Sequence, residues 1–512
     1  MATLTAAGTL AGLADRVRGE TTAERYQEYF SRFGTVIDAS DVGADATGGE
    51  SINPLLEEHV ADDTLLMFPP GEYLMTEQFR FTDYRNVGIV GNDATIVPGT
   101  VEAMDGRLAT AGTFSGPTRL FRLGVSYAPG DELRFEGLTF DFTADNSGFR
   151  AIEAYVKRDM LVRDVDVTGR HDLASFGPAL FSVTDPDGIS TVEGFRAPDG
   201  GAFSEDTLGD IWRGPTGILV PRSHEGKLWF RDCELGGFPD NGLYASSTAG
   251  RVVVKGGTYK NSNASNIRLY GDYSYVKDAT VVVDAAEDGH NQPGIRLDDG
   301  QHLWVYNTDV ELTDPNGDAI IVKDDVDSAR IQDCTITVGE GRMNYAVLVH
   351  ENAGVVDVFD TEITFDGTGN AIYVEGHNDD SDAPVKLLRT TITGDGSGED
   401  GRNAIRLARS GVDVEDVTVK MTGPDYRRGL VFLADDCTLD GGLVEATHYP
   451  VVNAANGTRI DDVTLRSYGR YQGLKLYDGY ADVTVTDSEI YNDVLDRGTE
   501  NLVLQNNTYP SS

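Results

Sequence analysis

Cationic, aromatic and acidic residues recur at equivalent positions through the second half of this chain. They lie in or beside short segments such as Ile267-Arg268-Leu269 and Ile295-Arg296-Leu297, where two apolar residues flank one variable residue. The first apolar residues of nine such segments, from Ile218 to Leu430, lie 24 to 33 residues apart. If each segment is a strand stacked on the next, its outward side chain becomes the neighbour of its counterparts.

Two adjacent columns of outward side chains hold the residues that could carry out chemistry. The first column is Tyr244, Arg268, Arg296, Ile321, Leu348, Tyr373, Arg406, Val431 and Lys475, and the second is Ser246, Tyr270, Asp298, Lys323, His350, Glu375 and Ala408. The candidate catalytic residues are Arg268, Arg296, Asp298, Lys323, His350 and Asp324, and the candidate substrate-binding residues are Tyr244, Tyr270, Tyr373, Glu375 and Arg406. Tyrosine rings are suited to stacking on sugar rings, and guanidinium and ammonium groups bind carboxylates or sulfates. The columns therefore predict an extended site for an anionic sugar chain.

Two reactions fit these residues. Elimination from a uronate needs a base, for which Lys323, His350 or an arginine is suited, and cations that stabilise the developing negative charge. In that reaction Arg268 and Arg296 would neutralise the carboxylate, and Tyr270 would protonate the leaving oxygen. Hydrolysis needs two carboxyl groups about 5 Å apart for retention or about 6.5–9.5 Å apart for inversion. Asp298 with Asp324 or with Glu351 would supply them.

Two other interpretations compete with this site. In a chain so rich in acids, an arginine beside an aspartate on a sheet is commonly a solvated ion pair. A cleft beside the segment 170–216, with His171, Asp172, Arg213 and His224, is a second candidate site. That segment is rich in Pro and Gly, and we expect a long loop insertion in the fold, of the kind that often carries function.

The repeat itself predicts the fold. A second short segment rich in β-branched residues follows each first one, and helical periodicity is nearly absent. A period near 25 residues is too short for a propeller blade, which needs about 40. We expect an all-β protein, a right-handed single-stranded parallel β-helix of about a dozen coils with a short N-terminal helical cap.

The boundaries follow from the same pattern. Residues 15–100 would form the cap and the first coils, with helices at 15–33 and 51–60, and residues 101–512 the β-helix with its insertion at 170–216. Residues 1–14 resemble the end of a secretory signal or, alternatively, a frayed helix. No segment has the length and hydropathy of a transmembrane helix.

Charge limits the partners. The 512-residue chain has 84 acidic and 42 basic residues and a net charge of −42. Such a charge opposes compaction unless salt screens it, as in proteins of salt-accumulating organisms. Nucleic acid is disfavoured because no basic stripe is present. We expect no cofactor, although the acidic surface would suit Ca²⁺.

Two N-terminal motifs resemble a known family. The stretch Gly43-Ala44-Asp45-Ala46-Thr47-Gly48-Gly49 and the later Phe68-Pro69-Pro70-Gly71-Glu72-Tyr73 are similar to the N-terminal signature of the pectate-lyase-like superfamily. The resemblance implies a right-handed β-helix and a secreted or surface protein that acts on polysaccharides. Polygalacturonase motifs (Asn-Thr-Asp, Gly-His-Gly, Arg-Ile-Lys) and the Trp-x-Asp-His of pectate lyases are missing, which argues against a standard pectinase.

Together these observations predict an extracellular or cell-surface protein of halophilic type that binds and cleaves an acidic polysaccharide, with elimination favoured over hydrolysis. The alternative is a non-catalytic carbohydrate-binding or adhesion module similar to a tailspike. Its expected partners are an anionic polysaccharide and no nucleic acid, and the chain would be a monomer or a homotrimer.

Overall fold

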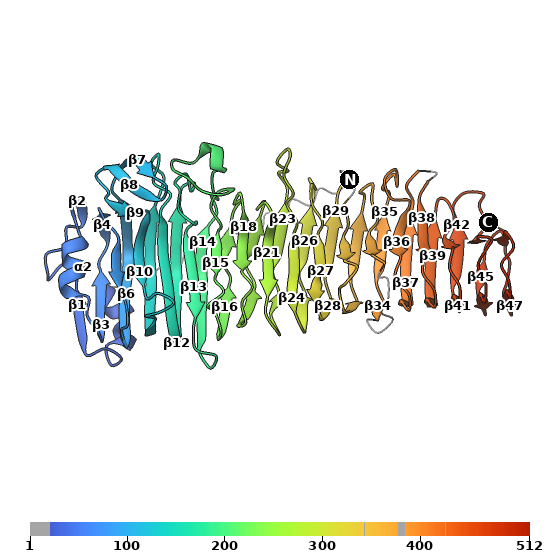
Figure 1. The fold of residues 1–512 in the computed structure, drawn as a ribbon, viewed down its shortest axis with the longest axis horizontal. Helices are drawn as coiled ribbons and strands as arrows, with labels where there is room; N and C mark the ends of the chain where they lie inside the picture. Colours follow the sequence, from blue (N-terminus) through green and yellow to red (C-terminus); the bar gives the residue numbers. More distant parts are fainter. Residues whose placement is uncertain (1–20, 342–343, 377–383, 425, 512) are drawn as a thin grey trace.

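The protein is an elongated parallel β-solenoid (Figure 1). The computed structural model describes residues 21–341, 344–376, 384–424 and 426–511. Forty-four strands form one continuous sheet of about 17 turns, which confirms the predicted all-β parallel class. The predicted dozen coils is too few, because strands such as β6 (Asn86–Pro98) and β12 (Arg150–Thr168) run through corners without a break and hide the repeat.

Each turn contributes strands to up to three parallel stacks, A, B and C. Stack A contains β5 (Phe79–Phe81), β10 (Arg119–Leu123), β12, β13 (Ala179–Val183), β15 (Ile218–Val220), β18 (Asn241–Ala245), β21 (Ser265–Tyr270), β24 (Ile295–Gly300), β27 (Ile320–Val326), β30 (Val347–Val349), β33 (Ile372–Val374), β36 (Asn403–Leu407), β38 (Arg428–Phe432), β40 (Val451–Asn453), β43 (Leu474–Leu476) and β46 (Val494–Asp496).

Stack B contains β1 (Thr35–Asp38), β3 (Thr64–Phe68), β6, β11 (Gly130–Asp141), β14 (Ile189–Ala197), β16 (Lys227–Arg231), β19 (Arg251–Lys255), β22 (Tyr275–Lys277), β25 (Leu303–Tyr306), β28 (Ser328–Gln332), β31 (Val355–Phe359), β34 (Val385–Leu388), β37 (Asp413–Met421), β39 (Thr438–Ala446), β41 (Arg459–Asp461), β44 (Thr484–Thr486) and β47 (Val503–Gln505).

Stack C contains β2 (Thr47–Ser51), β4 (Gly71–Met75), β17 (Glu234–Leu235), β20 (Thr258–Lys260), β23 (Thr280–Val283), β26 (Asp309–Leu312), β29 (Thr335–Val338), β32 (Glu362–Phe365), β35 (Thr391–Gly394), β42 (Thr464–Ser467) and β45 (Glu489–Ile490). A separate antiparallel sheet is formed by β7 (Val101–Asp105), β8 (Leu108–Gly112) and β9 (Gly116–Pro117).

Alternation fills the interior of the solenoid. In β21 and β24 the apolar residues Ile267, Leu269, Ile295 and Leu297 are fully buried, while Arg268 and Arg296 between them are not. Successive side chains of a strand point to opposite faces, so the apolar residues enter the core and the arginines face outward.

A left-handed corner separates stacks B and C. Asp232, Asp278, Asp333 and Asp360 occupy it with φ between 47° and 56°. Aspartate tolerates this conformation better than most residues, which accounts for part of the acidic composition. Cys233 and Cys334, which directly follow two of these aspartates, are buried in the core, as the repeat predicts.

The N-terminal segment contributes two short helices with different roles. Helix α2 (Asn53–His59) lies at the end of the solenoid beside β1 and β2 and inserts Leu56 into the core (Figure 1). The helix predicted over 15–33 is much shorter in its described part, where α1 is Thr22–Arg25 and a 3₁₀ turn follows at Gln27–Tyr29. This segment covers an outer side of β3 and β6 and not the open end.

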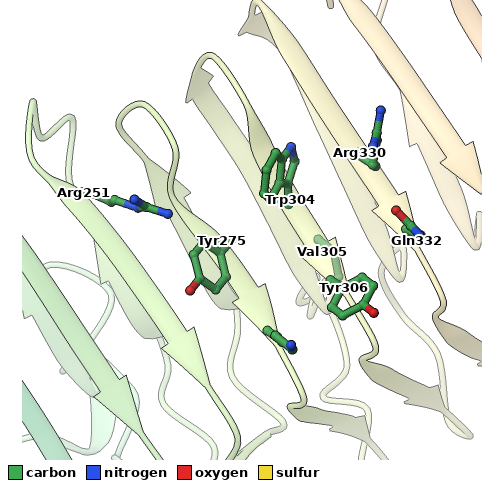
Figure 2. Close-up of a pocket in the computed structure, with 8 residues that line it drawn as sticks. Arg251, Tyr275, Trp304, Val305, Tyr306, Arg330 and Gln332 are labelled. Carbon is green, nitrogen blue, oxygen red and sulfur yellow. The ribbon is translucent and has the colours of Figure 1, made fainter.

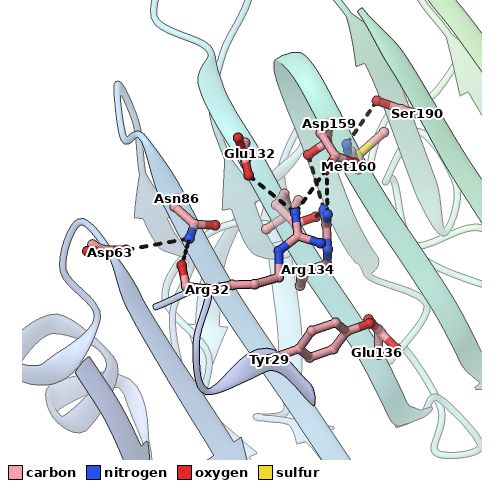
Figure 3. A network of polar contacts seen from close by, with 11 residues as sticks. Tyr29, Arg32, Asp63, Asn86, Glu132, Arg134, Glu136, Asp159, Met160 and Ser190 are labelled. Carbon is pink, nitrogen blue, oxygen red and sulfur yellow. Dashed lines mark hydrogen bonds and ion pairs between the residues drawn. The ribbon is translucent and has the colours of Figure 1, made fainter. Parts of the chain in front are cut away.

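Polar contacts fix the segment after α1 to the solenoid wall (Figure 3). The hydroxyl of Tyr29 donates to Oε1 of Glu136 at 2.5 Å, and Nη2 of Arg32 donates to Oδ2 of Asp159 at 3.2 Å. Burial raises the pKa of Glu136, although Tyr29 and Arg163 act in the opposite direction. The Tyr29 hydroxyl is thus one of the few groups that stabilise this buried carboxyl.

The segment 170–216 is more regular than the sequence predicts. It contains β13 and β14, which pair in parallel with strands before and after them. The stretches 170–178 and 198–217 lie outside the strands of the stacks, and the second forms a projection beside β15 and β18 (Figure 1). Pro178, Pro186, Pro198 and Pro215 all lie outside β13 and β14, which is why composition alone indicated one long loop.

We predict that Tyr29→Phe lowers the free energy of unfolding by about 1–3 kcal/mol, because it leaves the buried Glu136 carboxyl with one donor fewer. Urea denaturation followed by circular dichroism measures the change. Tyr127→Phe, the same substitution at a residue that is 78% exposed and whose hydroxyl makes only a surface contact with Arg80, is the control and should change stability by less than about 0.5 kcal/mol. Equal losses in the two variants would contradict this role for Tyr29.

Candidate functional site

Strand register brings the predicted first column together. Tyr244, Arg268, Arg296, Ile321, Leu348, Tyr373 and Arg406 are successive partners along β18, β21, β24, β27, β30, β33 and β36. Parallel neighbours lie about 4.8 Å apart, so these side chains form one continuous surface. We call the outward side chains of stack A from β18 to β36 the site face.

Two arginines of the site face converge on one carboxylate. Arg268 Nε donates to Asp298 Oδ2 at 2.7 Å, and Arg296 binds both Asp298 oxygens at 3.0–3.1 Å. The Tyr270 hydroxyl donates to the same carboxylate at 3.0 Å. Asp298 is 6% exposed and fully engaged, so it serves to hold the two guanidinium groups in place.

A bulge produces this arrangement. Asp299, and not Asp298, is the register partner of Tyr270 and of Asp325, because the pairing shifts after Leu297. Asp298 therefore leaves the regular column and turns toward the arginines. Burial and the nearby Asp325 raise the pKa of Asp299. The predicted second column placed Asp298 beside Tyr270. Their side chains are in contact, but the register partner of Tyr270 is Asp299.

Four residues on or directly after neighbouring strands of stack A form a second cluster. Lys323 Nζ lies 3.1 Å from His350 Nε2, and His350 Nδ1 lies 3.4 Å from Glu375 Oε2 and 3.8 Å from Asp324 Oδ2. Since ammonium can only donate, His350 Nε2 is the acceptor and Nδ1 carries the proton. Burial and the Lys323 charge lower the pKa of His350, which keeps the imidazole neutral.

The two clusters belong to one site. The charge of Arg296 also acts to lower the pKa of His350, so the arginine lies within electrostatic reach of the imidazole. Farther along the face, the Arg406 guanidinium lies 5.2 Å from the centre of the Tyr373 ring. Its Nε is buried and has no hydrogen-bond partner in the described part of the chain. An anionic ligand would supply one.

Asp318 joins the site although the sequence analysis missed it. Burial and, to a smaller extent, the Glu375 charge raise the pKa of its carboxyl to about 6, although the Tyr345 backbone hydrogen bond and Lys323 act in the opposite direction. Oδ1 accepts a hydrogen bond from the Tyr345 backbone at 2.9 Å. Asp318 precedes Ile320 by two residues, where other repeats carry Asn241, Asn370 and Asn403. An acid in an asparagine position was the signal that could have revealed it.

Arg409 supports the same site from beneath. Its guanidinium is buried and donates to the backbone oxygens of His350 and Ala353 at 2.6 and 2.7 Å. These bonds fix the turn that carries His350. The sequence gives no sign of this role, because Arg409 lies 59 residues away from His350.

The projection at 198–217 closes one side of the site face. A cavity of about 500 Å³ lies between them and is lined in part by Phe203, Arg213, His290 and Arg296. The Phe203 and His290 rings stack with their centres 4.4 Å apart. The cavity therefore links Arg213, from the second candidate site, to the site face.

The other residues of that second candidate site are structural. His171 and His224 are buried, and burial lowers their pKa values to about 4. The Asp172 carboxylate accepts hydrogen bonds from the backbone of Asn146, Ser147 and Gly148. Three side chains engaged in this way are not available as a reactive group.

No three His, Cys, Asp or Glu side chains gather to hold a metal ion within the described ranges. None of the helices described there is long and apolar enough to cross a membrane.

Comparisons with known proteins give only distant likenesses. No protein-family model and no curated protein sequence matches the chain. It is similar to a GH87 α-1,3-glucanase from Streptomyces thermodiastaticus, with 13% identity over 93% of this chain and 69% of that one (TM-score 0.29). It is also similar to tailspike protein 3 of bacteriophage CBA120, with 9% identity over 98% of this chain and 63% of that one (TM-score 0.32). A third similar structure is the Streptococcus pneumoniae surface adhesin PfbA, with 10% identity over 89% of this chain and 91% of that one (TM-score 0.28). Likenesses this distant assign no function.

We predict that Asp318→Asn stabilises the protein above pH 6. Because the pKa of Asp318 is higher in the folded state, about 6, than its ordinary value of 3.8, the folded state binds this proton more tightly than the unfolded state does. The contribution of Asp318 to stability is therefore fully present below pH 3.8 and is lost as the pH rises through about 6. The neutral amide avoids that loss. The free energy of unfolding of the variant should therefore exceed that of the wild type by about 1–3 kcal/mol at pH 8 and equal it at pH 3.5. Urea denaturation at both values measures the difference.

Asp309→Asn is the matched control, since Asp309 is exposed on β26 of the same turn. It should show no comparable dependence on pH. A constant difference between Asp318→Asn and the wild type across this range would contradict the buried-acid assignment.

Proposed function

We propose that the chain binds an anionic polysaccharide along the site face and cleaves it beside His350. The observation that carries this proposal is the aligned array of Lys323, His350 and Glu375 next to Arg296. It combines a neutral imidazole, a carboxylate that orients it and two cations in a chain whose net charge is −42. Perturbed titratable groups that converge in this way are typical of reactive sites.

Elimination from a uronate uses each of these groups. An incoming carboxylate would draw the Lys323 ammonium toward itself, which frees the lone pair of His350 Nε2. The imidazole would then remove the proton beside the carboxylate, and Glu375 would stabilise the imidazolium through Nδ1. Lys323 and Arg296 would stabilise the negative charge that develops on the carboxylate oxygens. The Asp318 or Tyr270 proton would pass to the leaving oxygen.

Hydrolysis is the second candidate, and the raised pKa of Asp318 favours it. A carboxyl that remains partly protonated near pH 6 can donate a proton to a glycosidic oxygen, and Glu375 would supply the second carboxyl group. Asp298 is less suited to either role because both arginines and Tyr270 already occupy its oxygens.

The finer assignments are proposals as well. The N-terminal motifs and the solenoid support membership of the pectate-lyase-like superfamily, and a polysaccharide substrate supports an extracellular or cell-surface location. The net charge of −42 supports adaptation to high salt, since mutual repulsion is screened there. The same fold without catalysis, a binding or adhesion module, is the alternative that the experiment below must exclude.

We expect wild-type protein to depolymerise a polyuronate, and His350→Ala to lower kcat by about 10²- to 10⁴-fold because the base is lost. Lys323→Ala should lower kcat by a similar factor. Ultraviolet absorbance of unsaturated ends identifies elimination, and new reducing ends without that absorbance identify hydrolysis. His59→Gln and Lys420→Ala, outside the site face, are the controls and should leave kcat unchanged.

Cleavage that survives both site substitutions would place the reaction elsewhere. Retained binding without cleavage of any uronate or sulfated glycan would leave only the binding module.

A further inference from the structure

A second surface of the solenoid gathers cations and aromatic rings away from the site face. It consists of the outward side chains of β16, β19, β22, β25 and β28 in stack B, and we call it the aromatic–cationic face. Its cations are Lys227, Arg231, Arg251, Lys255, Lys277 and Arg330, and its aromatic residues are Trp229, Tyr275, Trp304 and Tyr306. No carboxylate occupies an outward position on these five strands, although acidic residues outnumber basic ones 84 to 42 in the chain.

The cations of this face are placed against one another. Strand register puts Arg231 beside Lys255 and Lys255 beside Lys277, and it also puts Lys227 beside Arg251. Like charges directly opposite each other in a sheet are destabilising. The charges of Arg251 and Arg231 add to burial in lowering the pKa of Lys227. The outward cations of these strands therefore repel one another, and because they lie outside the core, core packing does not require them.

All but one of these cations also lack a carboxylate partner among the described residues. Of the six, only Arg330 forms an ion pair with another described residue, namely Asp357 at 3.0 Å. The Nε atom of Arg251 is buried with no hydrogen-bond partner in the described ranges. Carboxylates lie at the corners on both sides of these strands, at Glu225, Asp272 and Asp327 before them and at Asp232, Asp278 and Asp333 after them, and on β31 and later strands. The unmet charge therefore faces outward.

A groove runs among the aromatic rings. A cavity of about 390 Å³ is lined by Arg251, Tyr275, Lys277, Trp304, Tyr306 and Arg330. Figure 2 shows Tyr275, Trp304 and Tyr306 on neighbouring strands with Arg251 and Arg330 at its two ends. A second cavity of about 490 Å³ continues past Trp304 and Arg330 toward Asp327 and Asp357, so the cationic part of the groove ends at Arg330. The two cavities share Trp304 and Arg330 and form one elongated groove.

The rings are available to a ligand. Trp304 is 44% exposed, which is unfavourable for so large an apolar group in the absence of a partner. Lys277 Nζ lies 4.8 Å from the centre of the Tyr306 ring, and Arg251 Cζ lies 5.3 Å from that of Tyr275. Tyr306 and Tyr275 therefore each have a cation beside them, the pairing that a ring-shaped anionic ligand would need.

We propose that the aromatic–cationic face is a second, non-catalytic binding groove for an anionic polysaccharide. Sugar rings would stack on Trp304, Tyr275 and Tyr306, and their carboxylate or sulfate groups would bind Arg251 and Lys277. A single-stranded nucleic acid also combines rings with negative charge. We choose a glycan over a nucleic acid because of the function proposed for the site face. A single polysaccharide molecule would then contact both surfaces of the protein.

Binding is measured by affinity electrophoresis in an inactive His350→Ala background, so that no probe is cleaved. The probes are polygalacturonate, dextran sulfate, uncharged dextran and oligothymidylate at about 0.15 M salt, where exposed charges still act over about 8 Å. We expect Trp304→Ala to weaken binding of an anionic glycan about tenfold or more. The double variant Arg251→Gln, Lys277→Gln should weaken it similarly and reduce its salt dependence.

Matched controls lie on the same solenoid. Lys386→Gln removes a cation of stack B outside the groove, and Tyr426→Ala removes an aromatic ring that is 57% exposed elsewhere. Both should bind the probes as the parent does. In the active background, the groove variants should cleave short oligosaccharides at the parental kcat, because the reacting groups are untouched.

Unchanged glycan binding in the groove variants would overturn the proposal, as would equal binding of uncharged dextran or preferential binding of oligothymidylate. These outcomes do not depend on catalysis. If no glycan is cleaved but the groove variants lose binding, the groove stands and the function proposed for the site face fails.

Discussion

The in-register pairing of parallel strands is the constraint on which every other feature of this molecule depends. Each strand of stack A is hydrogen-bonded to its counterpart in the next turn, so residues 24 to 33 positions apart become neighbours. Buried Ile, Leu and Val on one side of each strand prevent a slip by one residue, since a slip would expose them. Arg268 and Arg296 can share Asp298 only because this register is kept.

Local departures from the register create the chemistry. The bulge after Leu297 turns Asp298 toward the arginines, and the turn after β30 presents His350 between Lys323 and Glu375. The regular strands supply the rigid positions, and the irregular strand ends supply side chains that converge. A site built in this way can be varied from turn to turn without disturbing the core.

Acidic and basic residues occupy different parts of the solenoid. Many aspartates serve at the left-handed corners between stacks B and C, where their conformation and not their charge is required. Cations without carboxylate partners among the described residues gather on the aromatic–cationic face, whereas on the site face Arg268 and Arg296 share Asp298. In a chain with a net charge of −42, the aromatic–cationic face is a surface where an anionic partner would meet attraction.

The sequence predicted the fold class and the site-face columns because both follow from alternation and a regular period. It predicted too few turns, because β6 and β12 cross corners without a break, and it took the strands β13 and β14 for loop. Asp318 and Arg409 were missed for a different reason. Their roles depend on burial and on contacts across turns, to Tyr345 and to the His350 backbone, which no local pattern records.

The most direct test of the account is a crystal structure of the His350→Ala variant with a bound acidic oligosaccharide. The account predicts a sugar chain along the site face, with a carboxylate or sulfate within hydrogen-bonding distance of Arg296 and Lys323. It allows a second chain in the aromatic–cationic groove. An ordered oligosaccharide found only away from the site face would contradict the central claim.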